Sequence, residues 1–512
     1  MYGRVRGMTV LGVGGHPVTV EAFVGRGLPA LTLTGLPGAA VADARDRIRP
    51  AVEHAGLEWP LRRVVVNLAP GNLRKEGAGL DLPIAASVLV ATGQVPGAAV
   101  AGAVFFGELS LKGEVLPTPG VLSVAIAAVQ SGSPVVVVPK ANAVEAAHVE
   151  GIHVVAVSSL EQVVMFLRGT WHAPEIEVDA GAGWQSPAAD LADVRGQAQA
   201  RRALEVAAAG GHNLLLVGSP GAGKTMLARR LASILPELTR DEALEATQLH
   251  SVAGLLAGRG LLRQRPFRSP HHSISTVGLL GGGSSVLRPG EASLAHRGVL
   301  FLDELTEFRR DAIESLRQPL EDGCVVVTRA SGSVTFPARF TLVAAANPCP
   351  CGFRDDPVRE CGCREDQRAR YMAKLSGPLL DRIDLRVRVP RLTKHELLGA
   401  AGGEPSAVVR ARVLDARDRQ LHRYRDTVWT CNAHLPGPLA RRQASLTDEA
   451  EHLLGDAVEA SALSGRGFDR VIKVGRTIAD MEGVARVDVT HIAEALSYRE
   501  AFEPVERRAR AS

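Results

Sequence analysis

The sequence predicts an α/β fold: a parallel-sheet core with a phosphate-binding loop and a C-terminal helical lid, preceded by an α+β domain. Three observations support this prediction. Residues 218–225 read Gly-Ser-Pro-Gly-Ala-Gly-Lys-Thr, a Gly-rich loop ending in Lys and Thr. A short apolar run, 213–217, precedes the loop, and a segment with helical spacing, 226–235, follows it. Further apolar runs at 298–302 and 340–346 alternate with helical segments, as a parallel sheet requires.

The Gly-rich loop matches a P-loop. Binding nucleotide phosphates requires backbone N–H groups that point inward, and the tight turn that orients them requires glycine. Lys224 is expected to reach the β- and γ-phosphates, and the Thr225 hydroxyl is expected to hold Mg²⁺. The strand and helix around the loop place the phosphates at a helix N-terminus. The predicted cofactors are ATP and Mg²⁺, bound by Gly218, Ser219, Pro220, Gly221, Ala222, Gly223, Lys224 and Thr225.

Three later segments supply the other groups that a nucleoside triphosphatase needs. Asp303 and Glu304 end an apolar strand, where the Asp is expected to coordinate Mg²⁺ and the Glu to polarise the attacking water. Asn347 follows the next strand and is expected to orient that water. Arg382, in a segment ending Asp-Arg-Ile-Asp, is predicted to act on a neighbouring subunit's γ-phosphate as an arginine finger.

Composition excludes several classes of protein. A net charge of +4 argues against a histone-like basic binder but permits a groove lined locally with Arg. Aromatic residues make up 4% of the chain, which argues against extensive base stacking. The first residues lack the apolar core of a signal peptide, and the most apolar stretch, 84–107, is interrupted by Gln94 and Pro96. We therefore expect a cytoplasmic protein with reduced cysteines and no membrane span.

Sequence patterning divides the 512 residues into blocks. Residues 1–170 mix strands, such as 64–68 and 135–139, with helices over 39–55 and 121–131. A linker rich in Gly, Pro, Ala and acidic residues is expected over 171–189, followed by the ATPase core over 190–392. Residues 393–512 have helical periodicity, with helices expected over 448–463, 468–481 and 489–499, and suit a lid over the nucleotide.

These motifs resemble the AAA+ superfamily, in particular its magnesium-chelatase-like branch. The segments 288–304, 375–384 and 464–480 carry the resemblance. Nearly the whole chain is similar to the YifB/ComM family, whose competence member is a hexameric helicase that drives DNA branch migration. The resemblance therefore implies a homo-oligomeric ring, a hexamer, that binds branched or single-stranded DNA.

The same resemblance implies roles for single residues. It assigns Lys224 and Thr225 to Walker A, Asp303 and Glu304 to Walker B, Asn347 to sensor 1 and Arg382 to the arginine finger. Sensor 2 falls on Arg466 or Arg470. Arg466 is preferred because it opens the lid helix, where an Arg can point at the γ-phosphate.

The first block resembles the proteolytic domain of Lon. The segments 75–81 and 107–117 match the serine segment and the stretch before the Lon lysine. Gly79 falls at the nucleophile position, however, and Leu122 falls near the lysine position. Peptide cleavage needs an activated nucleophile, so a catalytically inactive domain is expected that serves as a collar of the ring or a DNA-guiding surface.

Four of the six cysteines lie within fifteen residues, as the two pairs Cys349/Cys351 and Cys361/Cys363. Four thiolates from two close pairs can surround Zn²⁺ tetrahedrally, although two-residue spacers are the commoner zinc signature. The alternative is a set of unliganded surface thiols. A disulfide is not expected in the cytosol.

Three further segments leave two interpretations open. His271 and His272 fit either an insert that projects toward a ring pore or a solvated polar loop. Residues 324–336 predict a β-hairpin with Arg329 near its tip, which either contacts DNA phosphate or is purely structural. The Arg-rich stretch 410–425 is expected to be a solvated helix face rather than a nucleic-acid contact.

Three functions fit these features. The first is a ring ATPase that moves along DNA and exchanges strands at branches. The second is a magnesium-chelatase-type ATPase subunit that drives metal insertion through partner proteins, and the third is a protein-remodelling ATPase. The fused first block is taken to argue against the chelatase function, on the expectation that the chelatase ATPase subunit resembles only the later blocks.

Overall fold

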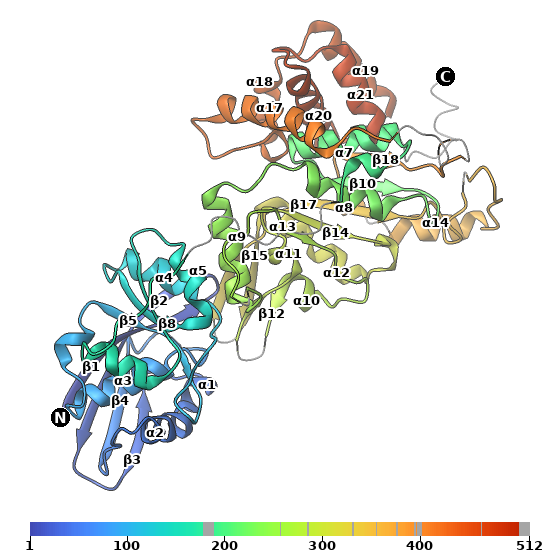
Figure 1. Ribbon diagram of the computed structural model, residues 1–512. Coiled ribbons are helices and arrows are strands. Elements are labelled where there is room, and N and C mark those ends of the chain that lie inside the picture. The colour runs from blue at the N-terminus through green and yellow to red at the C-terminus, as the bar shows by residue number, and fades with distance from the viewer. Residues whose placement is uncertain are drawn as a thin grey trace.

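The computed structural model describes residues 1–177, 189–256, 258–283, 286–329, 332–354, 356–374, 377–393, 396, 402–461 and 463–500. Three successive parts of the chain are distinct in space: the N-terminal part, the central part and the C-terminal helices (Figure 1). Most of the predicted linker, residues 178–188, lies outside the described residues. Among the helices that the structure describes, none is both long and apolar enough to span a membrane.

The N-terminal part, residues 1–177, is built on a seven-stranded mixed sheet of order β3-β4-β2-β1-β5-β8-β9. β1, β2 and β4 pair antiparallel, whereas β5, β8 and β9 extend the sheet in parallel from β1. Its strands are β1 (Tyr2–Leu11), β2 (Gly14–Gly25), β3 (Ala30–Thr34), β4 (Arg63–Ala69), β5 (Ala103–Phe105), β8 (Val135–Pro139) and β9 (His153–Val157).

Helices cover both faces of this sheet, because alternate strand residues point to opposite sides. Val137 packs with the helices on one face, while Val136 and Val138 pack with α4 and α5 on the other. The first face holds α1 (Ala39–Ala42), α2 (Ala44–His54), α3 (Asp81–Ala91) and α6 (Leu160–Leu167). The second holds α4 (Val121–Gln130) and α5 (Ala143–Ala147), and β6 (Glu108–Leu109) with β7 (Val115–Leu116) forms a short separate ribbon.

The described part of the central region contains a five-stranded sheet of order β11-β14-β17-β10-β18, in which every pair is parallel. The predicted parallel-sheet core is thereby confirmed. Its strands are β10 (Leu214–Val217), β11 (Phe267–Arg268), β14 (Val299–Leu302), β17 (Thr341–Ala346) and β18 (Leu385–Arg388). Because all five run the same way, the sheet has one carboxyl edge, where the P-loop follows β10, and one amino edge.

Helices also cover both faces of the central sheet. One face packs against the helices α7 (Ala198–Gly210) and α8 (Lys224–Ile234). The other packs against α9 (Arg240–Val252), α10 (Thr276–Leu280), α11 (Glu291–Leu294), α12 (Arg310–Ser315) and α13 (Arg317–Asp322). The predicted hairpin is present as β15 (Cys324–Arg329) and β16 (Gly332–Pro337), although residues 330–331 of its turn lie outside the described residues. The remaining elements are the ribbon β12 (Gly281–Gly282) with β13 (Arg288–Pro289), and the helices α14 (Glu365–Lys374) and α15 (Gly377–Leu380).

The C-terminal part is helical, as predicted. Its helices are α17 (Ser406–Tyr424), α18 (Gly437–Ala444), α19 (Asp448–Ser461), α20 (Gly465–Glu482) and α21 (Val489–Glu500). The Thr447 hydroxyl accepts a hydrogen bond from the Ala450 N–H at 3.3 Å, as expected of an N-cap before α19.

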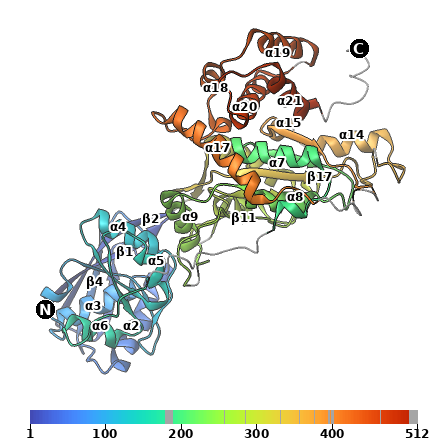
Figure 2. The same cartoon turned by 45° about the horizontal axis from the view of Figure 1, so that its top comes forward.

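The position of these helices differs from the expected lid over the nucleotide. Thr477 of α20 is hydrogen-bonded to His212 at 2.8 Å, and His212 lies just before β10, at the amino edge of the sheet. Figure 2 shows α20 and α21 beyond α7, on the far side of that helix from α8. The contacts that hold α20 therefore lie at the edge opposite the P-loop. Sequence periodicity marks a helical bundle but does not specify where it docks.

Candidate functional site

The P-loop has a backbone that only glycine allows at several positions. A Cβ on Gly218 would lie 2.1 Å from the carbonyl oxygen of Val389 in the segment after β18. Gly221 and Gly223 have φ values of +77° and +91°, in the left-handed region that L side chains rarely adopt. Helix α8 begins at Lys224, directly after this turn, so the loop presents a helix N-terminus to an anion.

Lys224 links the loop to the neighbouring strand. Its Nζ donates to the carbonyl oxygens of Gly218 and Ser219 at 2.6 and 3.0 Å, and to Oδ1 of Asn347 at 3.1 Å. Burial lowers the pKa of Lys224, and the carboxylates of Asp303 and Glu304 oppose that shift. The structure thus brings the predicted Walker A lysine and the predicted sensor 1 asparagine into direct contact.

Two oxygen groups converge beside the loop. The Thr225 hydroxyl donates to Oδ2 of Asp303 at 2.7 Å. Hydroxyl and carboxylate oxygens are the ligands that Mg²⁺ prefers, so this pair fits the ion. Strand β17 lies between β10 and β14, and this order places Asn347 between the P-loop and Asp303.

Glu304 stands at the mouth of the site with an unusual backbone. Its φ is +52°, and its N–H donates to Oδ1 of Asp303 at 3.0 Å. Its side chain is 57% exposed, so the carboxylate is accessible to water. Nδ1 of His272 lies 3.6 Å from Oε2 of Glu304.

His272 is a site residue that sequence reasoning missed. The sequence permits a pore insert or a solvated loop at His271–His272, whereas the structure places His272 beside Glu304, the predicted Walker B glutamate. It follows β11, which pairs in parallel with β14, so the ends of the two strands lie side by side. Only the strand order, which the sequence does not specify, would have revealed this.

The predicted arginines form a group far from their own P-loop. Arg382 is buried and forms an ion pair with Glu321, and Nη2 of Arg466 lies 3.7 Å from Oε1 of the same carboxylate. The carbonyl oxygen of Arg382 accepts a hydrogen bond from Asn213, which precedes β10. Both arginines therefore lie at the amino edge of the sheet.

Arg470, the alternative sensor 2, is engaged inside the protein. It forms an ion pair with buried Asp384, which also accepts the N–H of Asn213 at 3.0 Å. Burial alone would raise the pKa of Asp384, but Arg470 and His212 hold it below its usual range. The Arg466 side chain is 63% exposed against 19% for Arg470, so Arg466 is the more accessible of the two.

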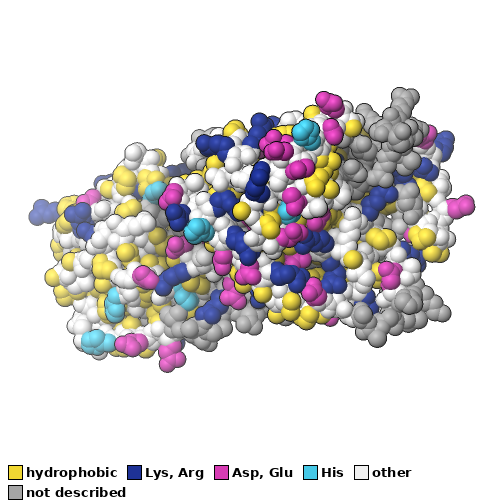
Figure 3. Space-filling model, turned by 90° about the horizontal axis from the view of Figure 1, so that it is seen from above, with side chains coloured by type: hydrophobic (Ala, Val, Ile, Leu, Met, Phe, Trp, Pro, Cys, Tyr) yellow, Lys and Arg dark blue, Asp and Glu magenta, His cyan; other side chains and the backbone are white. Residues whose placement is uncertain are grey.

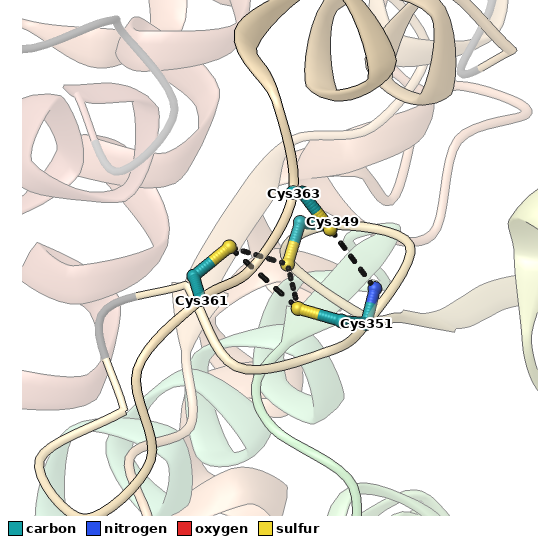
Figure 4. A group of neighbouring side chains, drawn as sticks. All are labelled: Cys349, Cys351, Cys361 and Cys363. Carbon is teal, nitrogen blue, oxygen red and sulfur yellow. Dashed lines mark hydrogen bonds between the residues drawn. The ribbon is translucent and has the colours of Figure 1, made fainter.

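The four clustered cysteines come together in space (Figure 4). Their sulfur atoms all lie within 4.8 Å of one another. Cys349 Sγ lies 3.4 Å from Cys351 Sγ and 3.6 Å from Cys361 Sγ, and the Cys351 N–H donates to Cys363 Sγ at 3.4 Å. The donors fit a thiophilic divalent cation such as Zn²⁺.

In the N-terminal part, the two positions expected for protease chemistry are closed. A Cβ on Gly79 would lie 2.2 to 2.8 Å from the ring of Phe106. Leu122 is fully buried, and its N–H lies 3.4 Å from the Ser251 hydroxyl, near the end of α9 in the central part. The Ser251 carbonyl also accepts the N–H of Gly120 at 3.0 Å. Helix α9 therefore covers the N-terminus of α4.

The Arg-rich helix α17 is exposed on one side only. Its arginines bind other parts of the chain: Arg410 the Ser233 carbonyl, Arg412 Glu205 and Glu404, Arg417 the Ala208 carbonyl, and Arg423 Asp480. These contacts attach α17 to α7, α8 and α20. The expectation of a solvated face holds for the side that carries Asp415, Asp418 and His422, which are exposed, but not for these four arginines.

Comparisons with known families agree over most of the chain. The model of the family described as "Magnesium chelatase, subunit ChlI" matches residues 190–397, and that of its C-terminal region matches 403–499. A third model, described as "Subunit ChlI of Mg-chelatase", matches residues 20–142. Because a chelatase-derived model matches the first block as well, that block does not exclude a chelatase-type function, contrary to expectation.

Individual relatives match almost end to end. A Mycobacterium tuberculosis protein of uncharacterized function is 46% identical over 499 residues, covering 97% of this chain and 98% of the relative. The protein YifB of Escherichia coli is 43% identical over 491 residues, with 96% and 95% covered. "Competence protein ComM" of Haemophilus influenzae is 42% identical over 494 residues, with 96% of each chain covered.

Proposed function

Because the chain belongs to the magnesium-chelatase-like YifB/ComM family, we propose that it is an AAA+ ring ATPase that acts on DNA. The ring is a hexamer, and its reaction is branch migration of the kind implied by the resemblance to ComM. It works in the cytoplasm, where its cysteines stay reduced. The sites for nucleotide, for water activation and for the neighbouring subunit are each assigned to residues below.

Hydrolysis depends on groups that converge at the carboxyl edge. Lys224 binds the β- and γ-phosphate oxygens, and Thr225 and Asp303 hold Mg²⁺, which neutralises phosphate charge when bound. Glu304 polarises the attacking water, and Asn347, fixed by its contact with Lys224, orients it. His272 positions the Glu304 carboxylate.

The proposal of a ring is supported mainly by the positions of Arg382 and Arg466. β18 begins at Leu385 and pairs in parallel with β10, from Leu214 to Val217. The four residues of β10 span about 13 Å, so the backbone at the start of β18 lies about this far from the P-loop, and Arg382 precedes that start. An arginine finger must contact the γ-phosphate, so we assign exposed Arg466, and Arg382 once its ion pair with Glu321 opens, to the nucleotide of the adjacent subunit.

The DNA substrate rests on similarity to ComM and on two surface features. The hairpin β15–β16 directly precedes the sensor 1 strand, and Arg329, near its tip, is exposed. On the face seen in Figure 3, basic and acidic side chains are interspersed. This pattern favours local contacts with phosphate, such as Arg329, over binding through a broad basic surface.

A chelatase-type ATPase is the second candidate, because the matching family models carry that description. A protein-remodelling ATPase is the third. The ATPase site would be the same in all three. ATP hydrolysis by purified protein should therefore be measured alone, with a four-way DNA junction, with linear duplex DNA and with an unfolded protein.

The DNA-motor proposal predicts that the junction stimulates hydrolysis and that strands exchange at the junction. Arg329→Ala should weaken this stimulation without changing hydrolysis in the absence of DNA. The exposed Arg310→Ala serves as control. If only the unfolded protein stimulates hydrolysis, or if nothing does, the DNA assignment is wrong while the ATPase assignment stands.

The remaining assignments complete this proposal. Residues 1–170 form the Lon-like collar without peptidase activity, 171–189 the linker, 190–392 the ATPase core and 393–512 a helical domain, held at the edge opposite the P-loop rather than over the nucleotide of the same chain. Zn²⁺ occupies the cluster of Cys349, Cys351, Cys361 and Cys363 as a second, structural metal.

A further inference from the structure

We propose that the cysteine module, residues 349–354 and 356–374, is a zinc-locked brace that joins the P-loop to the turn after Glu304, so that zinc occupancy sets ATP affinity and turnover. The cysteine module comprises the four thiols, the loop between the two pairs and helix α14. The inference rests on the proposed ATPase function, because the two segments that it joins are those that hold the nucleotide and the attacking water.

The thiol geometry suits a tetrahedral metal. With Zn–S bonds of about 2.3 Å, the edge of the tetrahedron is about 3.8 Å. The closest sulfur pairs are 3.4 and 3.6 Å apart, and all four sulfurs lie within 4.8 Å. Cys349 is buried and the other three are partly exposed, which leaves an entry path for the ion. Four thiolates select Zn²⁺ over Mg²⁺, a hard ion that prefers oxygen.

One side of the cysteine module touches the P-loop. Gly352 is buried with a φ of +82°, and a Cβ there would lie 2.6 Å from Cδ of Pro220. The Asp356 carboxylate accepts the N–H of Val358 at 2.9 Å and lies beside the Ser219 hydroxyl. The backbone between the cysteine pairs therefore packs directly on the loop that binds phosphate.

The other side of the cysteine module touches the turn after Glu304. The Thr306 hydroxyl donates to the Tyr371 hydroxyl of α14 at 2.7 Å, and Lys374 Nζ donates to the Thr306 carbonyl at 3.4 Å. Tyr371 is the only residue of α14 that is buried among those described. Asn347, which bonds Lys224, lies two residues before Cys349. The module thus contacts the P-loop, sensor 1 and Walker B segments.

Metal binding is what can hold this brace closed. Among the described residues between Cys351 and Cys363, Gly352 is the one that is buried, so the loop has no apolar core of its own. A coordinated ion replaces such a core and fixes the two cysteine pairs against each other. Without it, the loop gains conformational freedom, and its contacts with Ser219 and Pro220 loosen.

The first test compares zinc content with nucleotide binding in the full-length protein. Wild type purified without chelator should hold one Zn²⁺ per chain, and Co²⁺ substitution should give thiolate charge-transfer absorption. Cys361→Ser/Cys363→Ser should lose the metal, bind a fluorescent ATP analogue at least about tenfold more weakly and hydrolyse ATP up to about 100-fold more slowly. Cys324→Ser, which removes a thiol outside the cluster, should change none of these.

A second variant separates bracing from unfolding. Tyr371→Phe removes a single hydroxyl from α14 and should keep one Zn²⁺, with a melting temperature lowered by no more than a few degrees. Its turnover should fall about 2- to 10-fold, the range expected when one hydrogen bond is lost.

Three outcomes would overturn the brace: wild type without bound zinc, unchanged nucleotide binding after the metal is lost, or unchanged turnover in Tyr371→Phe. If zinc and nucleotide bind as expected but no ATP is hydrolysed, the proposed ATPase function is what fails.

Discussion

The two largest sheets that the structure describes have related architecture, but only the central one carries the residues predicted for catalysis. Both contain parallel strands and have helices on both faces, although β1, β2 and β4 of the N-terminal sheet pair antiparallel. At the carboxyl edge of the central sheet, Lys224, Thr225, Asp303 and Asn347 converge within hydrogen-bonding distance. In the N-terminal part, the two positions where the Lon resemblance places catalytic groups hold Gly79 and Leu122, both packed against other residues. A sheet with helices on both faces can therefore hold a catalytic site, but the side chains decide whether it does.

The difference extends to what covers each region. Glu304 is exposed at the mouth of the central site, whereas helix α9 covers the N-terminus of α4. Gln248 of α9 also donates to the Val13 carbonyl at 2.6 Å. These contacts attach the N-terminal part to the central part. The comparison therefore predicts that substitutions at the carboxyl edge of the central sheet strongly reduce ATP hydrolysis. It also predicts that a substitution in the N-terminal part creates no peptidase activity.

The largest effect is expected from Lys224→Ala. The substitution removes the only ammonium that reaches the described P-loop, and ATP hydrolysis should fall by at least about 100-fold, in line with the loss of a charged phosphate contact. Steady-state phosphate release measures it. Lys112→Ala, an exposed lysine of the first part, is the control and should retain wild-type activity.

Glu304→Gln should separate binding from turnover. The amide keeps the shape of the side chain but cannot polarise water, so hydrolysis should drop about 100-fold while a fluorescent ATP analogue still binds. Glu307→Gln, in the same turn and also exposed, controls for the loss of charge. Hydrolysis by Glu304→Gln at the wild-type rate would remove Glu304 from its assigned role.

A smaller effect is expected from His272→Ala. The imidazole lies 3.6 Å from the Glu304 carboxylate and orients it, so turnover should fall about 2- to 10-fold with little change in ATP binding. His271→Ala removes a neighbouring ring whose Nδ1 contacts the Ser273 hydroxyl at 2.8 Å, and should have less effect. Equal losses in both variants would show that the loop, not the contact with Glu304, matters.

Gly79→Ser is expected to cause no change in activity, because it should not create a peptidase. The substitution places a hydroxyl at the nucleophile position, but the Cβ of the new serine would overlap the Phe106 ring. Casein should stay intact in the presence of ATP, and the first part should lose about 1–3 kcal/mol of stability from overpacking. Gly71→Ser, where a Cβ meets nothing within 4 Å, is the control for thermal unfolding. Cleavage by Gly79→Ser would mean that this part lacks only its nucleophile.

The sequence predicted those features that depend on residues close together along the chain. The P-loop, the strand ending in Asp303 and the strand ending before Asn347 each combine an apolar run with a polar terminus, and the structure brings them together. The helices over 448–463, 468–481 and 489–499 were expected close to where α19, α20 and α21 lie. Amphipathic spacing fixes such elements without knowledge of their neighbours.

What the sequence left open depends on contacts between distant segments. The docking of α20 at the amino edge depends on His212 and Thr477, which are 265 residues apart. The approach of Arg466 to Glu321 and of His272 to Glu304 likewise follows from how strands and helices are ordered in space. No periodicity or spacing within one segment encodes such pairings.

The central claim is that each catalytic site is completed by an arginine of the next subunit, and a mixing experiment tests it most directly. Arg382→Ala subunits should bind ATP but hydrolyse it about 1000-fold more slowly, the lower end of what an arginine finger contributes. Mixed with Lys224→Ala subunits, they should regain hydrolysis, because some interfaces then pair an intact P-loop with an intact Arg382. A mixture shown to co-assemble, yet with no more activity than its separate components, would contradict the account.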